Sequence, residues 1–176
     1  MRSICSVLSV FSFGKVFLFV IPLMFFSFPS LLAQSTSYKA LLNVLYDKDF
    51  PTLKPEEITS LSSYQVLDAR EKQEYEVSHL SDAIWTGYDT FDLVNLDSLD
   101  RNKPVLVYCT VGARSQEIGM KLKEAGFNQV YNLYGGIIHW ANLKKPLFRD
   151  AELTNKVHTY SKSWGIWLKE GEKVYD

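Results

Sequence analysis

The sequence predicts an α/β fold with a parallel central sheet. Short apolar runs typical of buried strands alternate with segments whose apolar residues recur every three or four positions, as in helices. The clearest strand is the unbroken apolar run at 104–108, a pattern found where a parallel strand is buried on both faces. Shorter runs predict further strands at 65–68, 83–85 and 129–133.

Helical patterns fill much of the chain between these strands. The segment 35–48 carries leucine and tyrosine side chains at helical spacing. Pro55 and the two acids after it are typical of a helix start, with Ile58 and Leu61 on the inner face of that helix. We expect the remaining helices at 71–77, 115–125 and 135–143.

Composition indicates the size of the protein and excludes several classes of function. The chain has 176 residues with 47% apolar side chains, which fits one packed domain preceded by an export segment. It has 19 basic and 20 acidic residues, and no Lys/Arg run could neutralise a phosphate backbone, so we expect no nucleic-acid partner. The three histidines lack metal-ligand spacing, so we expect neither a metal nor a cofactor.

The N-terminal segment has the pattern of a secretory signal peptide. Arg2 and Lys15 are its only charges, the stretch 16–28 is apolar, and Ala33 supplies the small residue before a cleavage site. We expect cleavage after Ala33 and a domain exported to the periplasm or the extracellular space. The alternative is an uncleaved membrane anchor, but the apolar run is shorter than a spanning helix and a proline interrupts it.

The cysteine content leaves one thiol to explain. The chain has Cys5, inside the expected signal peptide, and Cys109. Cleavage leaves Cys109 alone, so the mature chain cannot form an internal disulfide. This thiol is then either buried and inert, or reactive and able to oxidise or cross-link in an oxidising compartment.

The sequence around Cys109 favours a reactive thiol. Cys109 directly follows the strand at 104–108 and begins a short loop that ends where a helix starts. Sites form at the carboxyl ends of parallel strands, and loop N–H groups together with a helix dipole favour a thiolate there. Gly112 permits the close approach that such a loop needs, and Arg114 adds a positive charge nearby.

An ordered set of motifs covers roughly 56–146. The set comprises Leu67-Asp68-Ala69-Arg70 with Glu74-Tyr75, Ser78-His79-Leu80, Ala83-Ile84, Val107-Tyr108-Cys109, Gly112-Ala113-Arg114-Ser115, Ala125-Gly126-Phe127, Val130 and Leu133-Tyr134-Gly135-Gly136-Ile137, followed by Trp140. In this order the motifs resemble the rhodanese-like (sulfurtransferase) family. Any single motif is weakly specific, whereas the ordered set is highly specific. The resemblance implies a rhodanese-like fold, in which a mainly parallel sheet carries helices on both faces.

The resemblance also implies a site. It identifies Cys109 as the catalytic residue, which forms a persulfide inside a loop that binds the substrate. The implied substrate-binding residues are Thr110, Val111, Gly112, Ala113, Arg114 and Arg70, and the implied supporting residues are Asp68, Glu74 and Ser115. We further expect Arg114 to pair with an acid such as Glu74, and Asp68 to hold neighbouring loop N–H groups. His79 is expected to be structural, because nothing in the sequence pairs it with a nucleophile.

The chain departs from the family pattern at two places. Ser78-His79-Leu80-Ser81-Asp82-Ala83 stands where many members have Gly-His-Ile-Pro-Gly-Ala, which changes the detail of that turn. The side chains of Thr110, Val111 and Ala113 are uncharged, whereas members specialised for thiosulfate often carry extra positive charge in this loop. Thiosulfate is therefore a weaker expectation as the natural donor.

The sequence divides into four segments. We expect a signal peptide at 1–33, an N-terminal helical extension at 34–55, the rhodanese-like domain at 56–146 and an aromatic-rich extension at 147–176. The last segment contains His158, Tyr160, Trp164, Trp167 and Tyr175. We expect these aromatic side chains to pack on the domain, and an exposed partner-binding patch is the alternative.

Three functions compete at this stage. The first is a sulfurtransferase that takes sulfur from a small donor such as thiosulfate or a polysulfide and passes it to a thiol, cyanide or a protein thiol. The second is a non-catalytic sulfur carrier or partner-binding module of the same fold. The third is a phosphatase or arsenate-reductase relative, which resembles this fold but needs five residues between cysteine and arginine, whereas four separate Cys109 from Arg114.

The signal-peptide interpretation predicts the mature N-terminus. Material from an exporting host should begin at or near Gln34, and loss of Arg2 and Lys15 should make the chain two charges more negative. N-terminal sequencing and isoelectric focusing measure both properties. A full-length chain recovered in the membrane fraction would instead support the anchor.

Overall fold

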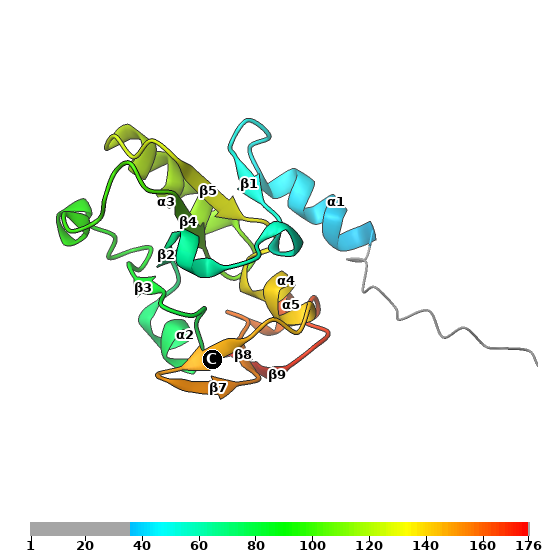
Figure 1. The fold of residues 1–176 in the computed structure, drawn as a ribbon. Coiled ribbons are helices and arrows are strands. Elements are labelled where there is room, and N and C mark those ends of the chain that lie inside the picture. Colours follow the sequence, from blue (N-terminus) through cyan, green and yellow to red (C-terminus); the bar gives the residue numbers. More distant parts are fainter. Residues whose placement is uncertain (1–35, 176) are drawn as a thin grey trace, which may run out of the picture. The chain divides into compact units, whose positions relative to one another are not determined.

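The computed structural model describes residues 36–175 and contains a five-stranded sheet (Figure 1). The strand order is β1-β5-β4-β2-β3, and every pairing in this sheet is parallel. Its strands are β1 (Thr52–Leu53), β2 (Gln65–Asp68), β3 (Ile84–Trp85), β4 (Val105–Tyr108) and β5 (Val130–Leu133). The predicted α/β class is confirmed. The expected signal peptide at 1–33, with Cys5, lies outside the described residues.

Four helices of the domain lie close to their expected places. They are α1 (Thr36–Leu45), α2 (Lys72–Val77), α3 (Ala113–Glu124) and α4 (Gly136–Asn142). The prediction of a helix starting at Pro55 is wrong, because the chain forms two 3-10 turns there, at 55–57 and 61–63. Ile58 adopts an extended conformation that ends the first turn, yet its side chain is buried, so the inward face was predicted correctly.

Alternation along the strands divides the core into two layers. Val66 and Leu106 belong to the apolar cluster that includes α1 and α4, whereas Leu67 and Val107 belong to the cluster of α3. Successive side chains of a strand point to opposite faces, so this division follows from the strand geometry. Figure 1 shows α3 and α4 on opposite sides of the sheet, and the carboxyl ends of β2 and β4 lie next to each other in register.

The C-terminal extension forms secondary structure that the sequence did not reveal. It contains β6 (Leu147–Arg149) antiparallel to β7 (Glu152–Thr154), and β8 (Lys156–His158) parallel to β9 (Glu172–Val174), with the short helix α5 (Lys162–Gly165) between the last two. Figure 1 shows these elements beside α2 and α4. Within the described part of the chain, no helix has the length and apolar character needed to cross a membrane.

The aromatic side chains of the extension divide into two groups. Trp164 and Trp167 pack against the core, and Trp167 stacks on Tyr38 of α1 with ring centroids 5.1 Å apart. Tyr160 and Tyr175 remain 53% and 40% exposed. The expected packing is therefore confirmed for the tryptophans and not for these two tyrosines.

Candidate active site

Cys109 lies at the carboxyl end of β4, at the start of a loop that leads directly into α3. Its thiol is nearly inaccessible, with 1% of the residue exposed. The N–H of Gly112 donates a hydrogen bond to Sγ at 3.1 Å, which closes the loop around the sulfur. Gly112 has φ +104° and caps the N-terminus of α3, so the backbone uses the left-handed region that glycine adopts easily.

The carbonyl groups of four consecutive loop residues bind donors outside the loop. Cys109 O and Thr110 O accept the N–H groups of Ile137 and Ile138 in α4, at 2.9 and 3.2 Å. The N–H and C=O of a trans peptide point in opposite directions. Each carbonyl turned outward therefore turns the N–H of the following residue to the opposite side.

The first glycine of α4 lets that helix approach the loop. Gly136 has φ +55°, and a Cβ placed there would lie 2.3 Å from the carbonyl oxygen of Cys109. Any larger residue would push α4 away from the loop and break its hydrogen bonds. The requirement for glycine at this position is therefore steric as well as conformational.

Tyr46 of the N-terminal extension holds the third carbonyl. Tyr46 donates its hydroxyl proton to Val111 O and accepts the N–H of Gly135 at 2.8 Å. Tyr38 donates to Gly135 O at 3.0 Å. Burial raises the pKa of Tyr46 well above its ordinary value, so its hydroxyl stays protonated and remains a donor. The sequence predicted the helix but not this role.

A buried amide holds the fourth carbonyl. Asn132 in β5 donates to Gly112 O at 2.8 Å and accepts the hydroxyl proton of Ser115 at 2.7 Å. Ser115 therefore supports the loop through Asn132, as its supporting role predicts. Asn132 itself was not predicted, although a polar residue inside an apolar strand was a signal that could have identified it.

Asp68 and Arg70 form a buried ion pair behind the loop. Arg70 donates from Nε to Asp68 Oδ1 at 2.9 Å and from Nη2 to Asp68 Oδ2 at 2.6 Å, and it also binds the carbonyl of Ser78. Asp68 accepts the N–H of Arg70 and the hydroxyl of Tyr108, so it holds loop groups as expected. Burial alone would lower the pKa of Arg70, but the charge of Asp68 raises it, so the guanidinium stays charged.

Arg70 was predicted to contact a substrate, but it is not among the residues that line the cavity over Cys109. The arginine side chain is completely buried. Its position is explained by the carboxylate of Asp68, which a buried guanidinium needs as a partner. Arg70 therefore helps to fix the ends of β2 and β4, and its contact with a substrate stays a prediction.

Arg114 and Glu74 form the expected ion pair. Arg114 binds both carboxylate oxygens of Glu74, at 2.7 and 2.9 Å, and its Nη2 also donates to Thr110 Oγ1 at 2.8 Å. Burial alone would raise the pKa of Glu74, but hydrogen bonds and charge from Arg114 lower it. The charge of Arg114 is therefore compensated within the protein before any substrate arrives.

A cavity of about 340 Å³ lies over the thiol. Its lining residues are Glu71, Tyr88, Asp89, Cys109, Thr110, Val111, Ala113, Arg114, Tyr160 and Trp164. The structure thus brings Cys109 and the expected loop residues except Gly112 to one cavity. Gly112 contacts the sulfur through its N–H, and Asp68, Glu74 and Ser115 do not line the cavity. Tyr160 and Trp164 were not assigned to the site, and the density of aromatic residues in the tail was the signal for them.

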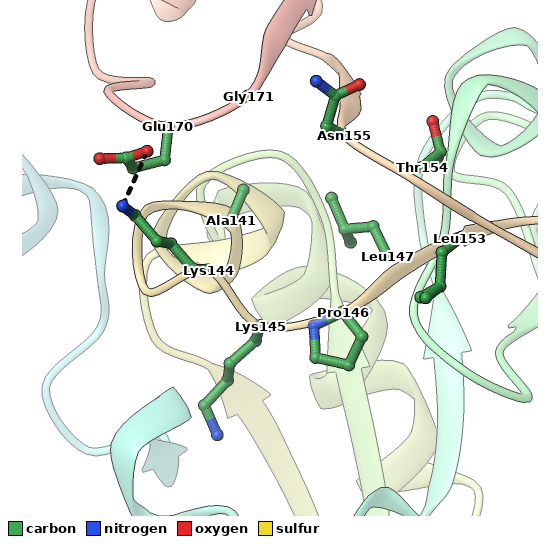
Figure 2. A pocket seen from close by; sticks show the side chains of 10 residues that line it. All are labelled: Ala141, Lys144, Lys145, Pro146, Leu147, Leu153, Thr154, Asn155, Glu170 and Gly171. Carbon is green, nitrogen blue, oxygen red and sulfur yellow. Dashed lines mark ion pairs between the residues drawn. The ribbon is translucent and has the colours of Figure 1, made fainter.

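A larger cavity of about 760 Å³ lies elsewhere, between α4 and the C-terminal extension (Figure 2). It contains the surface pair Lys144–Glu170, whose charged atoms are 3.5 Å apart, while Lys145 points in another direction. No cysteine or histidine lines it. Its size alone does not make it a reaction site, so the cavity over Cys109 is the candidate.

Comparison with known proteins agrees with this geometry. Residues 55–143 match the Rhodanese-like domain family. Thiosulfate sulfurtransferase GlpE of Coxiella burnetii (strain RSA 331 / Henzerling II) is 32% identical over 93 residues, which cover 53% of this chain and 86% of that relative. The tRNA uridine(34) hydroxylase of Sodalis glossinidius (strain morsitans) is 31% identical over 121 residues, 64% of this chain, but the chain spans only 34% of its length.

Solved structures show the same fold. A thiosulfate sulfurtransferase from Pseudomonas aeruginosa superposes with a TM-score of 0.53 at 27% identity, covering 63% of this chain and 22% of that one. The polysulfide-sulfur transferase homodimer from Wolinella succinogenes gives a TM-score of 0.50 at 25% identity, covering 64% of this chain and 87% of that one.

The contact between α4 and the loop predicts the effect of a methyl group at Gly136. Gly136→Ala should lower the free energy of unfolding by about 2 kcal/mol more than Gly126→Ala, because only the first methyl meets the loop backbone. Gly126 is the matched control, since it has φ +89° and the nearest atom to its Cβ is 4.0 Å away. Denaturant unfolding measures both, and equal losses would contradict the steric role.

The Glu74 pair predicts a pH-dependent defect in Arg114→Ala. We expect the free energy of unfolding to fall by about 2–3 kcal/mol at pH 7, because the variant buries the carboxylate of Glu74 without its partner. In the wild type the pKa of Glu74 is lowered on folding from its ordinary value of 4.5. The pair therefore stabilises the fold above pH 4.5, and this stabilisation is lost as the pH falls through the folded pKa.

The difference in free energy of unfolding between Arg114→Ala and the wild type should consequently shrink below pH 4.5. Urea unfolding at pH 7 and at lower pH measures it. Lys144→Ala removes the cation of an exposed pair and is the control, with an expected change below about 0.5 kcal/mol at either pH. A defect of Arg114→Ala that is constant with pH would show that packing, not charge, explains the contribution of the arginine.

Proposed function

Because the chain belongs to the rhodanese-like domain family, we propose that it is a sulfurtransferase that carries sulfane sulfur as a persulfide on Cys109. One observation supports this most directly. The thiol sits at the end of a buried parallel strand, receives the N–H of Gly112 and faces a cavity. The same arrangement would hold an anionic sulfur without a general base, much as an oxyanion hole holds oxygen.

The proposed reaction has two balanced steps. In the first, the Cys109 thiolate attacks the sulfane sulfur of the donor, the donor's S–S bond breaks, and its remaining part leaves as an anion, which is sulfite for thiosulfate. In the second, a nucleophilic acceptor attacks the outer sulfur of the persulfide, and Cys109 leaves again as a thiolate. The loop N–H groups stabilise the charge on Sγ at the start and at the end.

The geometry supports this reaction over phosphoryl transfer. Four residues separate Cys109 from Arg114, and both terminal nitrogens of that arginine bind Glu74. A phosphate site needs its arginine free to bind equatorial oxygens. A purely partner-binding role is less favoured, because the cysteine is present and lies at the cavity.

The sulfurtransferase relatives support this class of substrate more than the hydroxylases do. The chain spans 86% of the Coxiella burnetii thiosulfate sulfurtransferase but 34% of the Sodalis glossinidius hydroxylase. We propose a small sulfane donor and a thiol, cyanide or protein-thiol acceptor. We also propose that the domain works outside the cytoplasm, which the charge and hydropathy pattern of residues 1–33 supports.

The persulfide proposal is tested by mass spectrometry. After incubation with a polysulfide or thiosulfate, the protein should gain the mass of one sulfur, and cyanide or a thiol should remove it. Cys109→Ser should abolish the gain and keep the fold, because the substitution is nearly isosteric. The wild type should not hydrolyse an aryl phosphate above background, and one glycine inserted between Val111 and Gly112 should weaken sulfur loading.

Two results would contradict the proposal. The first is full sulfurtransferase activity in Cys109→Ser, which would place the reaction elsewhere. The second is turnover of a phosphate ester by the wild type, which would mean that the four-residue spacing still admits an oxyanion.

A further inference from the structure

The C-terminal extension supplies one wall of the cavity over Cys109. Tyr160 and Trp164 both line it, although about fifty residues separate them from the thiol in sequence. Trp164 is also packed against the core, whereas Tyr160 is 53% exposed. An exposed aromatic side chain at the mouth of a reaction cavity is available to a ligand.

The backbone holds Tyr160 in an uncommon conformation. Its φ is +65°, in the left-handed region that residues with a side chain rarely adopt. The N–H of Tyr160 donates to Nδ1 of His158 at 3.1 Å, and the N–H of Ser161 donates to Thr159 O at 2.7 Å, which fixes this turn. Such strain is retained where the surrounding structure needs the side chain in one place.

The cavity has little positive charge to offer an anion. Glu71 and Asp89 are its acids, and Arg114 is the one cation among its lining residues. Both terminal nitrogens of Arg114 bind Glu74, and the ring of Tyr160 covers the guanidinium with the centroid 5.0 Å away. The cavity therefore combines aromatic side chains with two carboxylates, a setting that suits an organic cation.

We infer that this cavity selects an organic thiol that carries a positive charge near its sulfur as the acceptor, through Tyr160 and Asp89. The inference rests on the proposed persulfide of Cys109. The acceptor thiolate attacks the outer sulfur, the Sγ–S bond breaks, and Cys109 leaves as a thiolate. The outer sulfur, which takes a proton from water after the persulfide has formed, departs on the acceptor as an organic persulfide, so neither an oxidant nor a reductant is needed.

The test compares three small thiols on protein already loaded with sulfur. The full chain is treated with polysulfide, freed of excess donor, and checked for the added sulfur mass. Single-turnover transfer is then followed with cysteamine, which is cationic, 2-mercaptoethanol, which is neutral, and 3-mercaptopropionate, which is anionic. The rate ratio of cysteamine to 3-mercaptopropionate is compared between variants, so that the intrinsic reactivity of each thiol cancels.

Three variants distinguish an effect of the cavity residues on the rate ratio from an effect of the tail in general. Asp89→Asn removes one carboxylate, and Tyr160→Asn removes the ring while keeping a residue that tolerates the left-handed backbone. Each should lower the rate ratio by at least about threefold, the size of an exposed cation–aromatic contact. Tyr175→Asn makes the same chemical change at a tail tyrosine outside the cavity and should leave the ratio unchanged.

The outcomes distinguish the two proposals. Absence of the sulfur mass on the wild type would overturn the proposed function and this inference with it. Normal loading with an unchanged rate ratio in Asp89→Asn and Tyr160→Asn would overturn the inference alone. An equal change in Tyr175→Asn would also overturn it, because the effect would then come from the tail in general.

Discussion

The site depends on one constraint: the loop after Cys109 can turn its N–H groups toward sulfur only if its carbonyl groups find donors elsewhere. Four successive carbonyls do so, using the backbone of α4, the hydroxyl of Tyr46 and the amide of Asn132. A buried carbonyl without a donor would be costly. The thiol site therefore extends well beyond the cavity, into α1, α4 and β5.

Two buried ion pairs stand behind this loop, and they position groups more than they stabilise the fold. Asp68–Arg70 and Glu74–Arg114 tie the segment after β2 to the end of β4 and to the start of α3. Removing charges from water largely offsets their attraction, so such pairs contribute modestly to stability while both partners are present. Nη1 of Arg70 even lacks a hydrogen-bond partner among the described residues.

The hydrophobic pattern of the sequence predicted the strands whose positions depend on neighbouring residues alone. The strand at 65–68 has the predicted bounds, and β4 and β5 each begin one residue later than expected, because apolar runs and glycine stops reflect burial and chain reversal directly. The pair Thr52–Leu53 was missed because it lies between Pro51 and Pro55 in a turn-rich stretch, and it becomes a strand only by pairing with 132–133.

The burial of Arg70 and the contact of Tyr160 with the cavity were also missed. Both depend on which distant groups approach, and a single sequence does not show that. The aromatic tail was noticed as a feature of composition, but its composition could not show that one tyrosine reaches the cysteine cavity. The same holds for Asn132, whose partner lies twenty residues away.

The hydrogen bonds of Tyr38 in α1 and of Tyr46, the residue after α1, also have a consequence for the order of folding. Tyr46 binds Gly135 across 89 positions of sequence, and Tyr38 binds it across 97. Contacts this distant close slowly in folding, because the chain between them must first lose its conformational freedom. The carbonyl groups of the sulfur loop therefore gain all their donors only once the segment of Tyr46, β5 and α4 have come together, so the environment of Cys109 forms late in folding.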